Sequence, residues 1–269
     1  MLHPSREKLV VGNWKMNLTL SGGMDLLRGL VSQIRLRDDV KCVVCPPFIH
    51  LGASAEFIRP QPGYATGADR TTGSGLLLGA QNCHAEPAGA FTGEVSASML
   101  ASIPVQYVIT GHSERRNLMG ETDEIIRVKL QAVLTAGLTP ILCCGESSAD
   151  RKAGNHFSVV DRQLAACLSE LTVQQAEGVI IAYEPVWAIG TGEVATPGQA
   201  KEMHAHIRRW LNDRFGTATA EHIPLLYGGS ISPENAAELF VQPEIDGGLV
   251  GGASLRPESF AAIYEAMPR

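Results

Sequence analysis

The chain shows its building unit most clearly in Val179-Ile-Ile-Ala-Tyr-Glu-Pro-Val-Trp-Ala-Ile-Gly-Thr-Gly192, which is followed by helical spacing over residues 196–211. Residues 179–182 form a short apolar run without apolar–polar alternation, as parallel strands buried on both faces do. At the start of the helical segment, Thr196 can act as the N-cap, Pro197 fits the first helical position and Gln199 completes a capping box. The order predicts a strand, a loop and a helix.

The same unit recurs along the chain. Short apolar runs occupy residues 9–11, 43–45, 76–78, 107–109, 141–144, 179–182, 225–227 and 249–250. Weaker helical patterns lie between them at residues 26–34, 122–134, 159–171 and 233–240. Eight strands alternating with helices in 269 residues favour a closed (β/α)₈ barrel, an α/β fold with one domain over residues 1–269. The alternative, a doubly wound sheet, is weakened because no G-x-G-x-x-G turn follows the first strand.

Composition narrows the functional classes. The chain has 28 acidic residues and 22 Lys and Arg residues, which gives a net charge of −6. This is the wrong sign for binding a nucleic-acid backbone. Six cysteines are too few for a disulfide scaffold, and no apolar stretch is long enough for a membrane span. We therefore expect a cytoplasmic protein without nucleic-acid or membrane partners. Residues 59–75, rich in Gly and Pro, are expected to form an extended surface loop.

A pair of cysteines, Cys42 and Cys45, has C-x-x-C spacing inside an apolar run. In a strand, residues three apart point to opposite faces, so we do not expect the pair to bind a metal or to form a redox couple. The histidines give no metal-binding pattern either, since His204 and His206 would point to different sides of their helix. The sequence therefore predicts no metal and no cofactor.

Polar residues follow several of the predicted strands, at the end of a barrel where active sites lie. Asn13 and Lys15 follow the first strand, and Lys15 is either a cation for an anionic ligand or a solvated surface lysine. His112 follows the fourth strand directly, where an imidazole could polarise a ligand or transfer a proton. Glu184 follows the sixth strand, between apolar segments, and burying a carboxylate there is costly unless it has a function.

The segment after Glu184 is almost without polar side chains and is bounded by proline and glycine. Its members are Pro185, Val186, Trp187, Ala188, Ile189, Gly190, Thr191 and Gly192. A lid that closes over a ligand and expels water would have this composition, whereas the alternative is a further buried strand. The seventh and eighth strands end in glycine-rich turns, residues 228–230 and 247–254, which suit backbone binding of a phosphate. Together these parts predict metal-free proton transfer beside a carbonyl in a small phosphorylated compound.

Several motifs, in order, resemble the triosephosphate isomerase family over about residues 8–260. They are Asn13-Trp-Lys-Met-Asn17, Gly79-Ala-Gln-Asn82, Gly89-Ala-Phe-Thr-Gly-Glu94, Gly111-His-Ser-Glu-Arg-Arg116, residues 183–192, Tyr227-Gly-Gly-Ser230 and Leu249-Val-Gly-Gly-Ala-Ser254. The resemblance implies the isomerisation of dihydroxyacetone phosphate and D-glyceraldehyde 3-phosphate through an enediol, a step of glycolysis and gluconeogenesis. It also implies a homodimer that needs no cofactor.

The resemblance also implies residue roles. Glu184 would be the base, His112 a neutral electrophile, and Lys15 and Asn13 would stabilise the oxyanion. The phosphate would bind to Gly190, Ser230, Gly251 and Gly252, while Glu114 and Ser113 would be supporting residues and Thr92 would reach into the partner subunit.

Some positions depart from the family pattern. Glu193 stands where the trailing hinge of the lid commonly has Lys. Gly248 replaces a larger apolar residue, which predicts a packing gap or extra flexibility near the phosphate site. Two alternatives therefore stay open. One is a paralogue that isomerises a four-carbon keto-sugar phosphate, for which Gly248 would leave space, and the other is a phosphate-binding barrel without catalysis.

Overall fold

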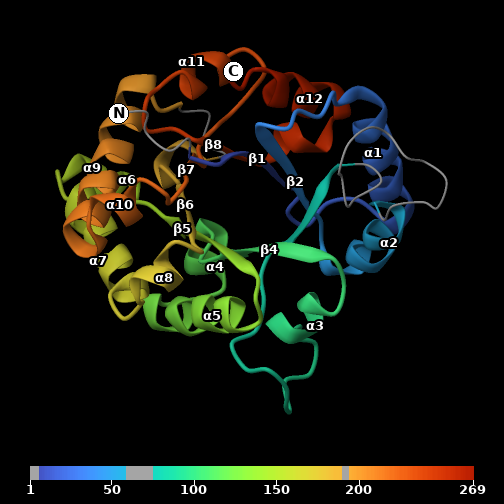
Figure 1. Cartoon of the computed structure of the whole chain (residues 1–269), viewed down its shortest axis with the longest axis horizontal. Coiled ribbons are helices and arrows are strands. Elements are labelled where there is room, and N and C mark those ends of the chain that lie inside the picture. Colours follow the sequence, from blue (N-terminus) through green and yellow to red (C-terminus); the bar gives the residue numbers. More distant parts are fainter. Residues whose placement is uncertain (1–5, 59–74, 190–193) are drawn as a thin grey trace.

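The computed structural model describes residues 6–58, 75–189 and 194–269. In these ranges, eight parallel strands close into a barrel in which each strand pairs with the next and β1 pairs with β8 (Figure 1). The strands are β1 Lys8–Asn13, β2 Val40–Cys45, β3 Leu77–Ala80, β4 Val105–Thr110, β5 Thr139–Cys144, β6 Ile180–Tyr183, β7 Leu225–Tyr227 and β8 Gly247–Val250. All eight overlap the predicted runs, so the predicted barrel is confirmed.

A ring of helices surrounds the barrel (Figure 1). The helices are α1 Leu20–Gln33, α2 Phe48–Ile58, α3 Ala97–Ala101, α4 Ser113–Leu118, α5 Asp123–Thr135, α6 Ser148–Lys152, α7 His156–Leu168, α8 Val173–Ala176, α9 Pro197–Phe215, α10 Thr217–Ala220, α11 Ala236–Phe240 and α12 Pro257–Glu265, with 3₁₀ turns at Val186–Ala188 (η1) and Gly252–Leu255 (η2). None of the helices in the described ranges is long and apolar enough to cross a membrane. The predicted surface loop at 59–75 lies outside the described residues except for Gly75.

Helix α9 begins as its sequence predicts. The Thr196 hydroxyl accepts a hydrogen bond from the Gln199 backbone N–H, the Gln199 side chain accepts one from the Thr196 backbone N–H, and Pro197 occupies the first turn. This reciprocal pair satisfies two backbone donors that would otherwise lack a partner. The helix that follows the predicted lid therefore has a fixed starting point.

Two of the longer helices, α2 and α12, lie outside the predicted helical segments. In α2 the apolar residues do not form one stripe, because Phe48 and Ile49 are exposed while Leu51 is buried. The sequence of α12 does contain a pattern that indicates a helix. Pro257 stands at the first helical position, and the apolar residues that follow are buried with helical spacing.

Buried apolar side chains form two layers. One fills the barrel interior, and the other lies between the strands and the surrounding helices. Cys42 belongs to the outer layer and Cys45 to the inner one, which confirms that their side chains point to opposite faces of β2. Burial raises the pKa of both thiols well above the ordinary value. All six cysteines are buried and free.

Barrel closure depends on a close approach of two backbones. A Cβ atom on Gly247 would lie 1.7 Å from the Leu9 carbonyl oxygen, and the φ angle of Gly247 is +152°. Only glycine fits at this junction of β8 and β1.

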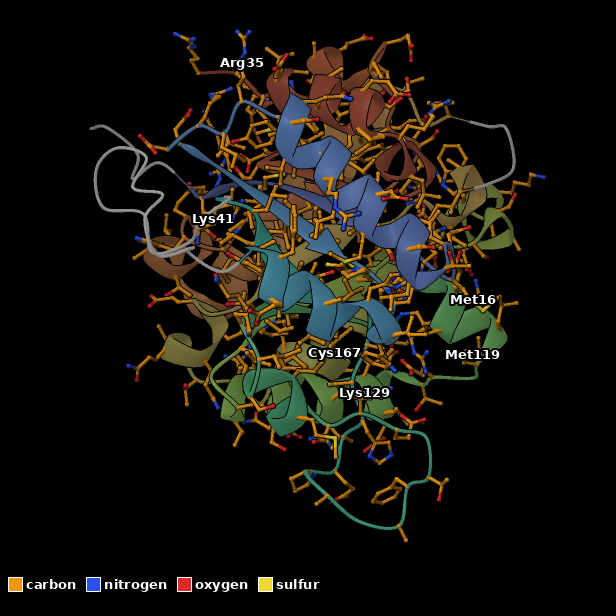
Figure 2. The ribbon with its side chains drawn as sticks, turned by 90° about the vertical axis from the view of Figure 1, so that its right-hand side faces the viewer. Met16, Arg35, Lys41, Met119, Lys129 and Cys167 are labelled. Carbon is orange, nitrogen blue, oxygen red and sulfur yellow. The ribbon has the colours of Figure 1, made fainter. Side chains whose placement is uncertain are left out.

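In Figure 2, Lys41 near the start of β2 lies to the left, whereas Met16, beyond β1, and Met119, beyond α4, lie at the right margin. The carboxyl ends of the strands therefore face right in that view.

Candidate active site

A cavity of about 260 Å³ opens at the carboxyl ends of the strands. It brings together most of the residues predicted from sequence: Asn13, Lys15, His112, Glu184, Ala188, Ile189, Ser230, Gly251 and Gly252. A larger hollow of about 450 Å³ lies at the opposite end of the barrel and contains none of these residues. The smaller cavity is therefore the candidate active site.

Glu184 directly follows β6 and is buried, with 2 % of its surface exposed. Its backbone N–H donates to the Cys144 carbonyl oxygen at 2.8 Å, which ties it to the end of β5. Its carboxylate has two partners, since Oε2 accepts from the Ser113 backbone N–H at 2.8 Å and Oε1 lies 3.0 Å from His112 Nε2. A buried carboxylate is thus satisfied by groups on the neighbouring α4 turn.

His112 caps the N-terminus of α4, and its two ring nitrogens have different roles. The Glu114 backbone N–H donates to Nδ1 at 3.2 Å, so Nδ1 carries the lone pair and the ring proton of the neutral form resides on Nε2. Burial has the largest single effect on the pKa of His112 and lowers it, but the Glu184 and Glu114 carboxylates together raise it more, and the net direction is upward. The backbone geometry favours the neutral ring that was predicted, whereas the nearby carboxylate favours the imidazolium.

Lys15 has a left-handed backbone with a φ angle of +52°, which is uncommon for a residue other than glycine. Two hydrogen bonds hold this conformation. The Lys15 backbone N–H donates to Asn13 Oδ1 at 3.0 Å, and Gln81 Nε2 donates to the Lys15 carbonyl oxygen at 2.9 Å. Lys15 Nζ lies 2.7 Å from Glu114 Oε1. The side chain is therefore held in a charged pair at the cavity and is not a freely solvated lysine.

The glycine-rich turns after β7 and β8 form the other side of the cavity. A Cβ atom on Gly251 would lie 3.4 Å from Lys15 Cε, so the turn backbone passes beside the lysine side chain. Ser230 and Gly252 are exposed at the cavity mouth. Gly190, the remaining predicted phosphate contact, lies outside the described residues.

The described part of the predicted lid begins with a compact turn, because residues 186–188 form the 3₁₀ helix η1. Glu146 anchors this turn: its carbonyl oxygen accepts from the Val186 N–H at 3.2 Å, and its Oε1 accepts from Trp187 Nε1 at 2.8 Å. The alternative of a further buried strand is wrong for this part. Thr191, Gly192 and Glu193 lie outside the described residues.

Comparisons with known proteins agree with this geometry. The family model described as triosephosphate isomerase matches residues 8–267. The chain belongs to the triosephosphate isomerase family. The triosephosphate isomerase of Rhodopirellula baltica is 46 % identical over 98 % of this chain and 99 % of its own length. Those of Cytophaga hutchinsonii and Carboxydothermus hydrogenoformans are 45 % and 47 % identical, over 97 % of this chain and 99 % and 98 % of their own lengths.

Members of the triosephosphate isomerase family are aldose–ketose isomerases, and this chain is one of them. None of the three names supports a four-carbon substrate or a barrel without catalysis. The sequence argument for extra space is also wrong. A Cβ atom on Gly248 would lie 2.5 Å from Ile231 Cδ1 and 3.2 Å from the Phe240 ring, so these two side chains occupy the predicted gap.

Glu146 is a site residue of this isomerase that sequence reasoning missed. Its side chain is completely buried and also accepts a hydrogen bond from the Tyr183 hydroxyl at 3.1 Å. It lies just beyond the end of β5, so the rule that functional residues follow strand ends would have found it.

The remaining predicted residues lie around the cavity and on the surface. Glu114 and Ser113 begin α4 and contact Lys15 and Glu184, as described above. Thr92 is exposed in the loop between β3 and α3, which projects from the body of the molecule (Figure 1). Among the described residues, no group of three or more His, Cys, Asp or Glu side chains could hold a metal ion.

Proposed function

We propose that this isomerase interconverts dihydroxyacetone phosphate and D-glyceraldehyde 3-phosphate with Glu184 as the base and His112 as the electrophile. The observation that carries the proposal is the 3.0 Å contact between Glu184 Oε1 and His112 Nε2, in a cavity that also contains Lys15. A base must reach a carbon-bound proton while a donor polarises the adjacent carbonyl oxygen. These two side chains supply both groups side by side.

In the first step, Glu184 exchanges its contacts with Ser113 and His112 for the substrate and removes a proton from the carbon beside the carbonyl. His112 Nε2–H donates to the carbonyl oxygen, whose negative charge grows as the enediolate forms. Lys15 and Asn13 stabilise that charge. The Lys15 ammonium has three donors, and among the described residues it uses one on Glu114, which leaves two for a ligand. His112 transfers the proton of the neighbouring hydroxyl oxygen to the former carbonyl oxygen, and Glu184 returns its proton to the former carbonyl carbon, so that the hydroxyl group becomes the new carbonyl.

The phosphate binds to backbone N–H groups of Gly190, Gly251 and Gly252 and beside Ser230. Lys15 is the only Lys or Arg among the described residues that line the cavity. Because the net charge of the chain is −6, attraction for an anion must come from Lys15 and from the glycine turns and not from the overall field. The lid, residues 185–192, closes over the intermediate and keeps water away from it.

A coupled assay with the two triose phosphates tests this assignment. Wild type is expected to turn over both substrates, whereas Glu184→Asp lowers kcat by moving the carboxylate back by one methylene. Lys15→Ala is expected to lose activity, while the exposed Lys201→Ala, which removes the same charge from α9, keeps it. Isomerisation of a tetrulose phosphate without turnover of triose phosphates would refute the assignment.

The assembly we propose is a homodimer, with Thr92 reaching into the partner. Several large apolar side chains are exposed near this loop or at the cavity end of the barrel, among them Met16, Phe91 and Met119, and they support an interface there. Light scattering measures the mass of the particle in solution, and a mass of one chain would contradict the homodimer.

The six free cysteines support a cytoplasmic location. The pairing of β1 with β8, which joins the two ends of the chain, supports one domain over residues 1–269.

A further inference from the structure

A short backbone segment at the end of β5, residues 144–146, lies against the base and the start of the lid. We call it the β5 strap. At one end, the Cys144 carbonyl oxygen accepts from the Glu184 N–H at 2.8 Å, and at the other the Glu146 carbonyl oxygen accepts from the Val186 N–H at 3.2 Å. Between them, Gly145 has no side chain, and a Cβ atom there would lie 1.7 Å from the Glu184 carbonyl oxygen. The backbone of Glu184 therefore rests directly on the strap.

Gln163 holds the middle of the β5 strap from the outer side. It lies on α7 and is 7 % exposed. Its Oε1 accepts from the Gly145 N–H at 2.8 Å, and its Nε2 donates to the Gly145 carbonyl oxygen at 3.1 Å. Gly145 lies one residue beyond β5, where the regular ladder has ended, so a side-chain amide replaces the partner that a neighbouring strand would supply.

We propose that Gln163 is a positioning residue for catalysis, which fixes the backbone of Glu184 through Gly145. The inference rests on the proposed role of Glu184 as the base. During turnover the Glu184 side chain must leave Ser113 and His112 and reach the substrate, and such a movement is reproducible only if its own backbone does not move. A carboxylate that is misplaced by about 1 Å loses much of its reactivity, about 100-fold in the strongest cases.

The chemistry of the amide gives a first test, Gln163→Met. Methionine has a similar length and shape but can neither donate to the Gly145 carbonyl oxygen nor accept from its N–H. We expect kcat on triose phosphates to fall about tenfold, which corresponds to about 1.4 kcal/mol of activation free energy. KM should stay within about twofold, because the proposed phosphate contacts Ser230, Gly251 and Gly252 lie in the turns after β7 and β8, away from the strap. A wild-type kcat would overturn the proposal.

Leu164→Ala is the matched control on the same helix. Leu164 is fully buried in the outer core layer, so its truncation loosens α7 without touching the strap. We expect a lower melting temperature, at least as far below wild type as that of Gln163→Met, with kcat within about twofold of wild type. If Leu164→Ala loses as much kcat as Gln163→Met, general loosening of α7 explains the effect and the proposal fails.

Gln163→Glu provides a second test that does not depend on Gln163→Met being folded. A protonated carboxyl can accept from the Gly145 N–H and donate to its carbonyl oxygen, whereas the ionised form cannot donate. The ratio of the variant kcat to the wild-type kcat should therefore rise as the pH falls from 8 to 5. The cavity that Gln163 lines carries charged groups of both signs, Arg116, Glu121, Asp123, Asp150 and Arg162, and Glu184 lies across Gly145. A flat ratio over this range would overturn the proposal.

Failure of this inference can be told apart from failure of the proposed function. If wild type has no triose phosphate activity, the function itself is wrong. If wild type is active and Glu184→Asp lowers kcat, but Gln163→Met and Gln163→Glu both behave as wild type, the base is correct and only the role of Gln163 is refuted.

Discussion

Replacing Gly145 by alanine should separate the base from its support by a distance that follows from the structure. The added Cβ atom would lie 1.7 Å from the Glu184 carbonyl oxygen and 2.7 Å from its carbonyl carbon. A Cβ atom essentially never lies closer than 3.0 Å to such an atom, so the two backbones must separate by about 1.3 Å, the difference between 3.0 and 1.7 Å. Misplacement by about 1 Å costs about 100-fold in rate in the strongest cases, and because this displacement is larger we expect kcat to fall by about 100-fold.

The same crowding should lower the free energy of unfolding by about 1–3 kcal/mol, as overpacking of a well-packed site does. The assays are steady-state kinetics on both triose phosphates and urea unfolding. Gly52→Ala is the control, because nothing lies within 4 Å of the added Cβ atom and the site is in α2, where alanine is a better helix former. The control should be slightly more stable and fully active. A Gly145→Ala enzyme with wild-type kcat would refute the reasoning that the strap fixes Glu184.

Three further results are expected. His112→Gln should lower kcat by at least about 100-fold while inorganic phosphate still inhibits competitively, and an unchanged kcat would remove His112 from the mechanism. Burial lowers the pKa of His204 to about 4, whereas the unfolded chain titrates near 6.5. The unfolded state therefore binds more protons between these values, and the free energy of unfolding should fall by up to about 3 kcal/mol as the pH decreases from 6.5 to 4. Urea unfolding should lose this component in His204→Gln. By NMR, His112 should have a lower pKa in Glu184→Gln than in wild type, and an equal or higher pKa would contradict the coupling of the two groups.

The strands were predictable from sequence because burial on both faces produces short apolar runs without apolar–polar alternation. The ends of the strands were less predictable, because β1 extends to Asn13 and β4 extends to Thr110. Both residues are polar, but the barrel buries them. The predicted catalytic residues share a cavity because each lies at or just beyond the carboxyl end of a strand of one barrel. Position after a strand thus carries most of the information about this site.

The sequence pattern does not predict which segments far apart in the chain come into contact. Gly248 predicted an empty space, but whether Ile231 and Phe240 fill it depends on how α11 and the turn after β7 fold back. Gln163 was recognisable as part of a helix, yet nothing in its spacing indicates that it bonds to Gly145, 18 residues earlier. The contacts of such residues can be recognised only from a structure that shows which elements pack together.

The charge of His112 is coupled to the position of Glu184 in a way that suits the proposed reaction. With the carboxylate 3.0 Å away, the net shift of the His112 pKa is upward, so the resting site favours the imidazolium more than water does. When Glu184 leaves for the substrate carbon, the largest contribution that raises this pKa is removed, while burial and the Glu114 N–H on Nδ1 remain and are opposed by the smaller effect of the Glu114 carboxylate. The ring is therefore most strongly driven to its neutral form, with its proton on Nε2, when the base is on the substrate. A neutral donor polarises the oxygen without giving up its proton prematurely, so one movement of Glu184 prepares both groups.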